Sequence, residues 1–221
     1  MPASSVLRLA LADISLSRTA AIAYTAGAMI GAVLVTQADP TVKSLGLSLI
    51  LCVMVGQCFH LPMVTVFKDI TQGTRAFTLS LPITPAEYAA GKLLANGLLF
   101  LAPAAALMVA VCVMPPDHRL FAAPLVLLML LGWLIFFMQN LGVAMVTEST
   151  GAMIVTLLAE MFVVGNGSMM VAPRIPGARH LWARLEAGGP VRDMAFGVLG
   201  LELVAIVALI LFLMSRKRRF V

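Results

Sequence analysis

Charge is scarce in this 221-residue sequence, since only 11% of its residues are Asp, Glu, Lys or Arg. A soluble domain usually contains about 25% charged residues, whereas 61% of the residues here are hydrophobic. A chain of this length cannot bury so much apolar surface and still present a polar shell to water. The composition therefore excludes a soluble enzyme and a disordered regulator, and it predicts a multi-pass membrane protein with little chain outside the bilayer.

Cysteine is also scarce, and Cys52, Cys58 and Cys112 all lie inside long apolar runs. Their odd number and position argue against a disulfide framework, and no Cys-x-x-Cys or Cys/His spacing typical of a metal site occurs. We interpret the three as small apolar packing residues. The patterns HExxH, Gly-x-Ser-x-Gly and the phosphate loop GxxxxGK[ST] are missing as well, so the sequence predicts no metal, no catalytic nucleophile and no nucleotide site of its own.

Six apolar stretches are each long enough to cross about 30 Å of hydrocarbon as a helix. Barrel strands would be shorter and would alternate in polarity. The expected fold class is therefore all-α, a polytopic membrane protein whose residues 1–221 form a single transmembrane domain. The predicted spans are residues 20–38, 45–67, 91–114, 120–146, 151–172 and 194–215.

Turn and charge signals separate these spans. Asp39-Pro40 divides the first two, and the break at 147–150 is the weakest because it holds a single charge, Glu148. Without that break, one helix would run from 120 to 172, too long for a bilayer. Before the first span, apolar residues at helical spacing predict a short interfacial helix at about residues 4–18, with a frayed leader as the alternative.

The basic residues indicate the topology of the chain. An even number of spans places both termini on one side, and a cytoplasmic placement puts nine Lys and Arg residues inside and six outside. We therefore interpret the net charge of +5 as a feature of membrane topology and expect no nucleic-acid partner.

The cytoplasmic loop 68–87 carries the most information. Its end predicts a helix start, with Thr84 as N-cap, Pro85 at the first helical position and Glu87 completing a capping box. A helix from Pro85 to the end of the third span would be about 45 Å long, so it begins in the cytosol. The preceding half-apolar segment, which includes Phe77, indicates a docking surface for a cytosolic partner.

The stretch 69–92 resembles a sequence pattern of the membrane subunits of ABC-2 type transporters, the small bacterial permeases with a type V exporter-like transmembrane domain. The predicted six spans, the interfacial helix and the external loop 173–193 are similar to that family too. The residues that fall on the pattern are Asp69, Gly73, Thr74, Phe77, Ser80, Leu81, Pro82, Thr84, Glu87 and Lys92.

The resemblance implies the membrane-spanning subunit of an ATP-driven exporter, located in the bacterial plasma (inner) membrane with both termini cytoplasmic. It would work as a homodimer with two copies of a separate cytosolic ATPase, which binds the ATP and Mg, so the chain would not be an enzyme by itself. The implied cargo is hydrophobic or amphipathic: a peptide, a toxin or antibiotic, or a lipid. The implied ATPase-coupling residues are Asp69, Gly73, Thr74, Arg75 and Phe77.

For Arg75, a contact with the ATPase and ordinary positive-inside anchoring both stay open. The small-xxx-small face formed by Gly27 and Gly31 is the candidate dimer interface. The basic external loop 173–193 could meet anionic lipid headgroups or acidic cargo, or it could be a solvated loop.

Polar residues at bilayer depth are the candidates for a transport pathway or gate. A charged carboxylate there costs about 2.5–3.5 kcal/mol on insertion scales, so it should face protein or a water-filled path. These candidates are Gln57, His60, Glu160, Asn166 and Glu202, for which a plain packing role is the alternative. Gln139 and Asn140 are expected to form interhelical hydrogen bonds.

Two other functions stay open at this stage. One is a membrane-embedded sensor or scaffold that binds a partner without transport. The other is an intramembrane enzyme that would use Glu160 and His60, although the sequence contains no paired carboxylates.

Overall fold

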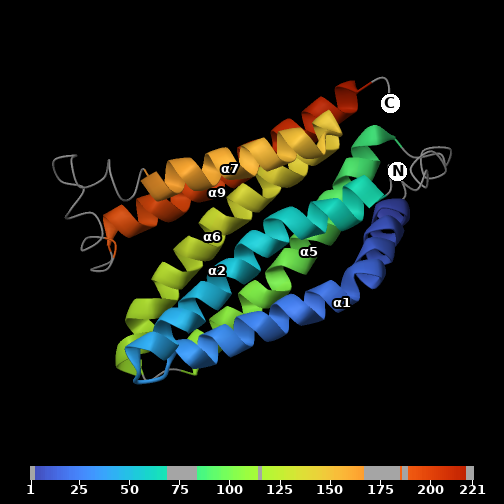
Figure 1. The fold of residues 1–221 in the computed structure, drawn as a ribbon. Helices are drawn as coiled ribbons and strands as arrows, with labels where there is room; N and C mark the ends of the chain where they lie inside the picture. Colours follow the sequence, from blue (N-terminus) through green and yellow to red (C-terminus); the bar gives the residue numbers. More distant parts are fainter. Residues whose placement is uncertain (1–2, 69–83, 114–115, 167–184, 186–188, 218–221) are drawn as a thin grey trace.

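The computed structural model describes residues 3–68, 84–113, 116–166, 185 and 189–217, and its regular elements in these ranges are all helices (Figure 1). By length and composition, α1, α2 continued by η1, α5, α6 and α9 could each cross a membrane. These helices confirm an all-α, multi-pass membrane protein. The elements are α1 (Ala3–Val35), α2 (Pro40–Pro62), η1 (Met63–Phe67), α5 (Pro85–Cys112), α6 (Pro116–Thr147), α7 (Thr150–Asn166) and α9 (Pro190–Arg216).

The predicted fifth span, 151–172, is only partly described. Helix α7 is apolar but comprises 17 residues, fewer than the roughly 20 that a span needs. The structure therefore establishes five helices long enough to cross the bilayer within the described residues, and the count of six stays a prediction.

Local hydrogen bonds explain two of the helix starts. At the start of α2, the Asp39 carboxylate accepts a hydrogen bond from the Thr41 backbone N–H at 2.7 Å. Hydrogen bonds from backbone N–H groups lower the pKa of Asp39 from its usual value. At the start of α5, the Thr84 backbone N–H donates to Glu87 Oε2 at 2.7 Å and the Glu87 N–H donates to Thr84 Oγ1 at 3.2 Å. The predicted capping box is confirmed.

The predicted break between 120 and 172 is also confirmed. Helix α6 ends at Thr147 and α7 begins at Thr150, with Glu148 between them in the left-handed region at φ 56°. The Ser149 hydroxyl accepts from the Ala152 N–H at 3.2 Å and so caps the new helix.

The N-terminal segment differs from expectation. The sequence predicts an interfacial helix separate from the first span, whereas the structure joins the two in one helix, α1, which bends along its length (Figure 1). Ala10, Asp13 and Ser17, at helical spacing, are buried, and α1 packs extensively against α5. The segment is thus held by protein contacts on one face, which the composition of residues 4–18 alone does not reveal.

The helices form one bundle in which α6 has a central position (Figure 1). Helix α1 packs against α2 and α5, whereas α9 and α7 pack against α6, which also contacts α2 and α5. Both chain termini lie at the same end of the bundle, together with the end of η1 and the start of α5 (Figure 1).

Glycines bring α1 and α2 close together. A Cβ on Gly31 would lie 2.7 Å from Ile50 Cγ1, and one on Gly46 would lie 2.7 Å from the Gly31 carbonyl oxygen. Gly27 faces Val53 in the same way. The small-xxx-small face predicted for a dimer is therefore used within the chain, against α2, and a dimer contact at this face stays a prediction.

We expect Gly46→Ala to destabilise the protein, because the added methyl meets backbone atoms of α1 that cannot move aside. Such overpacking costs about 1–3 kcal/mol. Gly132→Ala in α6 is the matched control, since a Cβ there meets nothing within 4 Å and alanine favours helix by about 1 kcal/mol. Thermal unfolding in detergent micelles should show a lower Tm for the first variant only; an unchanged Tm would contradict the close packing.

Candidate functional site: polar side chains between the helices

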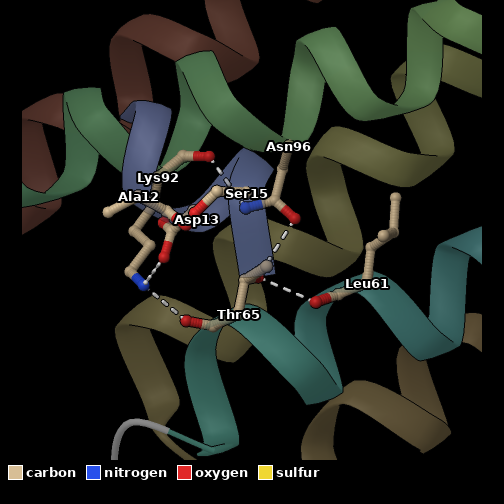
Figure 2. A network of polar contacts seen from close by, with 7 residues as sticks. All are labelled: Ala12, Asp13, Ser15, Leu61, Thr65, Lys92 and Asn96. Carbon is tan, nitrogen blue, oxygen red and sulfur yellow. Dashed lines mark hydrogen bonds and ion pairs between the residues drawn. The ribbon is translucent and has the colours of Figure 1, made fainter. Parts of the chain in front are cut away.

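A lysine with 0% of its surface exposed lies at the centre of the first polar cluster (Figure 2). The Nζ of Lys92, on α5, donates to Asp13 Oδ1 of α1 at 3.0 Å and to the Thr65 backbone carbonyl of η1 at 2.6 Å. Nζ also lies 5.4 Å from the centroid of the Tyr88 ring, within reach of a cation–π contact. One ammonium group thereby connects three elements.

Thr65 and Asn96 complete this cluster, which we call the polar core (Asp13, Thr65, Lys92 and Asn96). The Thr65 hydroxyl lies 3.0 Å from Asn96 Oδ1 and 2.8 Å from the Leu61 carbonyl, and it can donate to either. Asn96 Nδ2 donates to the Lys92 backbone carbonyl at 2.8 Å (Figure 2). The side chains therefore bind one another as well as the backbone.

The π-helical turn η1 helps to place the Thr65 carbonyl. Pro62 precedes this turn and lacks an N–H, so the regular α pattern of α2 cannot continue unchanged past it. The Lys68 N–H then donates to the Met63 carbonyl, a π-type bond. Within this widened turn, Thr65 presents its carbonyl oxygen to Lys92.

Sequence reasoning missed the polar core. It assigned Asp13 to an interfacial helix and used Lys92 only as part of a motif and as a topology marker. Two signals could have found the pair: Asp13 is the only acidic residue before Asp39, and Lys92 lies two turns into an apolar helix with Asn96 four residues on. A buried charge needs a partner of opposite sign, and few are available.

A second polar contact joins α6 to α7. Asn140, which is buried, donates from Nδ2 to the Phe136 carbonyl at 3.0 Å and to Glu160 Oε2 at 2.6 Å. The interhelical role predicted for Asn140 is thus confirmed. The neutral Asn140 amide thus donates a hydrogen bond to one oxygen of the Glu160 carboxylate.

Glu160 also lines a cavity of about 480 Å³ between α6, α7 and α9. Gln139, Thr147 and Thr156 contribute the other polar side chains, and the remaining lining residues are apolar or glycine. The cavity lies toward the last turns of α6 and α9, the end of the bundle that carries the termini (Figure 1).

Of the other pathway candidates, Gln57, His60 and Glu202 do not line the Glu160 cavity. Gln57 is buried and donates to the Val53 carbonyl at 3.4 Å, whereas the His60 ring packs edge-on against Tyr24 with centroids 5.9 Å apart. Glu202 is exposed on α9. Asn166 ends α7, and its side chain lies outside the described residues, as do the predicted coupling residues Asp69, Gly73, Thr74, Arg75 and Phe77.

Lys217 joins the end of α9 to the turn between α6 and α7. Its ammonium donates to the Met145 carbonyl at 3.1 Å and to the Val146 carbonyl at 3.0 Å, and it forms an ion pair with Glu148. These carbonyls belong to the last turn of α6, where a cation is favoured by both hydrogen bonding and the helix dipole. Among the described residues, no group of three or more His, Cys, Asp and Glu side chains could hold a metal ion.

We expect Lys92→Met to destabilise the protein by about 3–5 kcal/mol, because it removes the ammonium group that pairs with the buried Asp13 carboxylate. The double variant Asp13→Leu/Lys92→Met should recover much of that loss, since an apolar pair of similar volume removes the buried charge as well. Lys43→Met, at an exposed lysine of α2, is the control. Denaturant titration in detergent micelles measures all three variants; a double variant as unstable as Lys92→Met alone, or less stable, would argue against the pair.

A second substitution tests the role of Lys217. Lys217→Met should speed hydrogen exchange at the Glu148 amide, which donates to the Ala144 carbonyl at 3.1 Å, by about tenfold, as expected from the loss of hydrogen bonds to a charged group. Arg216→Met is the matched control, because its exposed guanidinium instead lies over the Phe212 ring. Equal exchange in both variants would show that Lys217 does not hold the turn.

The comparisons with known proteins add no family to this description. No family model matches the chain, and neither a curated protein nor a solved structure is significantly similar to it.

Proposed function

We propose that this chain is the membrane-spanning subunit of an ATP-driven exporter of the bacterial plasma membrane. Two copies would form the transport path, and two copies of a separate cytosolic ATPase would bind beneath them. The observation that carries the proposal is the transporter-like pattern of the segment 68–87. The helices on either side of it support this, because η1 ends and α5 begins at the end of the bundle where α1 begins and α9 ends (Figure 1).

The position of the polar core supports a coupling role for this segment. In the sequence the segment connects η1, which ends at Phe67, to α5, which begins at Pro85, and both of these elements contribute groups to the polar core. Because Lys92 also binds Asp13, a displacement of the loop would move η1, α5 and α1 together. A buried ion pair with several hydrogen bonds is costly to break and therefore transmits such a movement.

The division of labour between the subunits follows from the composition. The sequence contains no phosphate loop, so a partner must bind ATP and Mg. The long apolar helices provide the path, and apolar surfaces of this kind favour a hydrophobic or amphipathic cargo.

Co-expression with an ATPase tests this function directly, starting with any ATPase that contains a phosphate loop and is encoded beside this gene. We expect the two chains to co-purify and the ATPase rate to rise when this chain is present in lipid vesicles. Arg75→Glu should weaken the association by about tenfold or more, that is, by at least 1.4 kcal/mol, because the reversed charge would face the former contact of Arg75.

Lys43→Glu is the matched charge reversal, since Lys43 is exposed in the first turns of α2 at the opposite end of the bundle. It should leave the association unchanged. A chain that purifies alone as a stable monomer, with function insensitive to substitution in 73–77, would contradict the transporter proposal and favour the sensor or scaffold.

A further inference from the structure

The cavity between α6, α7 and α9 combines one acidic group with apolar walls. Glu160 enters it from α7, whereas Val143 of α6 and Ile206, Leu209 and Leu213 of α9 form much of its apolar surface. Its volume of about 480 Å³ lies within the range of about 300–1,000 Å³ typical of small-molecule sites. It can therefore hold a ligand with both an apolar body and a polar group.

The charge of Glu160 is not balanced by a cation within the described residues. Its hydrogen-bond donor there is the neutral amide of Asn140. Lys217 lies next to the cavity, but its ammonium is engaged by the Met145 and Val146 carbonyls and by Glu148. A neutral donor stabilises a carboxylate without neutralising it, so a cation entering the cavity would find an attractive field.

The polar core and the Glu160 cavity differ in whether a cation of the protein balances the carboxylate. In the polar core, the Lys92 ammonium is matched by the Asp13 carboxylate at 3.0 Å, so that cluster needs no external ion. At Glu160 the carboxylate faces a cavity large enough for a ligand. Ion pairs are stronger where the effective dielectric is low, and apolar walls contribute about 25 cal/mol per Å² of ligand surface that leaves water.

We propose that this cavity binds an amphipathic organic cation, whose charged group pairs with Glu160 while its apolar body contacts α6 and α9. The inference rests on the proposed function, for which it specifies the chemical class of the cargo. Because the cavity lies at the end of the bundle that carries the termini (Figure 1), the ligand would enter from the cytoplasmic side. An anion of the same shape is disfavoured by the same carboxylate.

Binding of tritiated tetraphenylphosphonium to the full chain in phosphatidylcholine nanodiscs tests the proposal. The measured quantity is the saturable component that excess unlabelled probe displaces. Glu160→Gln, which keeps the shape of the side chain, should weaken this binding by about tenfold or more, the effect of losing about 1.4 kcal/mol. Glu160→Asp, which keeps the charge, should retain binding better than Glu160→Gln.

Two controls separate the site from general effects of charge in the membrane. Glu202→Gln removes a carboxylate that is exposed in the middle of α9 and does not line the cavity, so binding should not change. Radiolabelled tetraphenylborate, similar in shape but negative and measured on its own, should show no saturable binding. Absent saturable binding of tetraphenylphosphonium, equal binding by Glu160→Gln, or equal saturable binding of tetraphenylborate would each overturn the proposal.

The assay needs no ATPase, so it separates this inference from the proposed function. If the ATPase co-purifies but the probe does not bind at Glu160, the cargo class is wrong and the exporter stands. If the probe binds at Glu160 but no ATPase associates, the site stands as a ligand site of a sensor.

Discussion

The lysine ammonium buried inside an apolar bundle is the constraint on which the first half of the structure depends. Removing an ammonium from water costs several kcal/mol even after relaxation, so Lys92 can remain charged only if other groups surround it. The Asp13 carboxylate and the Thr65 carbonyl do so from α1 and η1, while the Tyr88 ring does so from its own helix. Because each of these contacts fixes a distance, one charge sets how α1, η1 and α5 lie relative to one another.

The features that the sequence predicts correctly all depend on groups a few residues apart. The Thr84–Glu87 capping box, the division at Asp39-Pro40 and the break near Glu148 are each determined by neighbouring residues, and apolar runs of about 20 residues are sufficient to indicate long membrane helices. The length of an apolar run does not settle whether α7 crosses the membrane, because its described part has 17 residues. Local chemistry thus determines where the helices begin and end. It does not determine which helices pack against one another.

The contacts that sequence reasoning misses join residues far apart in the chain. Asp13 and Lys92 are separated by 79 positions, and nothing in the local pattern of either one identifies the other. The glycines of α1 show a related difficulty, since a small-xxx-small face indicates close helix packing but not which helix packs there. In this chain the face meets Gly46 and Ile50 of α2. Pairing of this kind requires the three-dimensional arrangement.

The two polar clusters divide the bundle into two groups of helices, which are held together in different ways. The polar core joins α1, η1 and α5 through a matched ion pair, whereas Glu160 and Lys217 join α6, α7 and α9 around a cavity. Helix α6 contacts both groups, and α5 of the first group also contacts α9 of the second, so relative movement of the two groups would change both of these contacts. A loop attached to η1 and α5 would displace the group that is held together by charge. The cavity belongs to the other group, so such a displacement would alter its surroundings without breaking the ion pair.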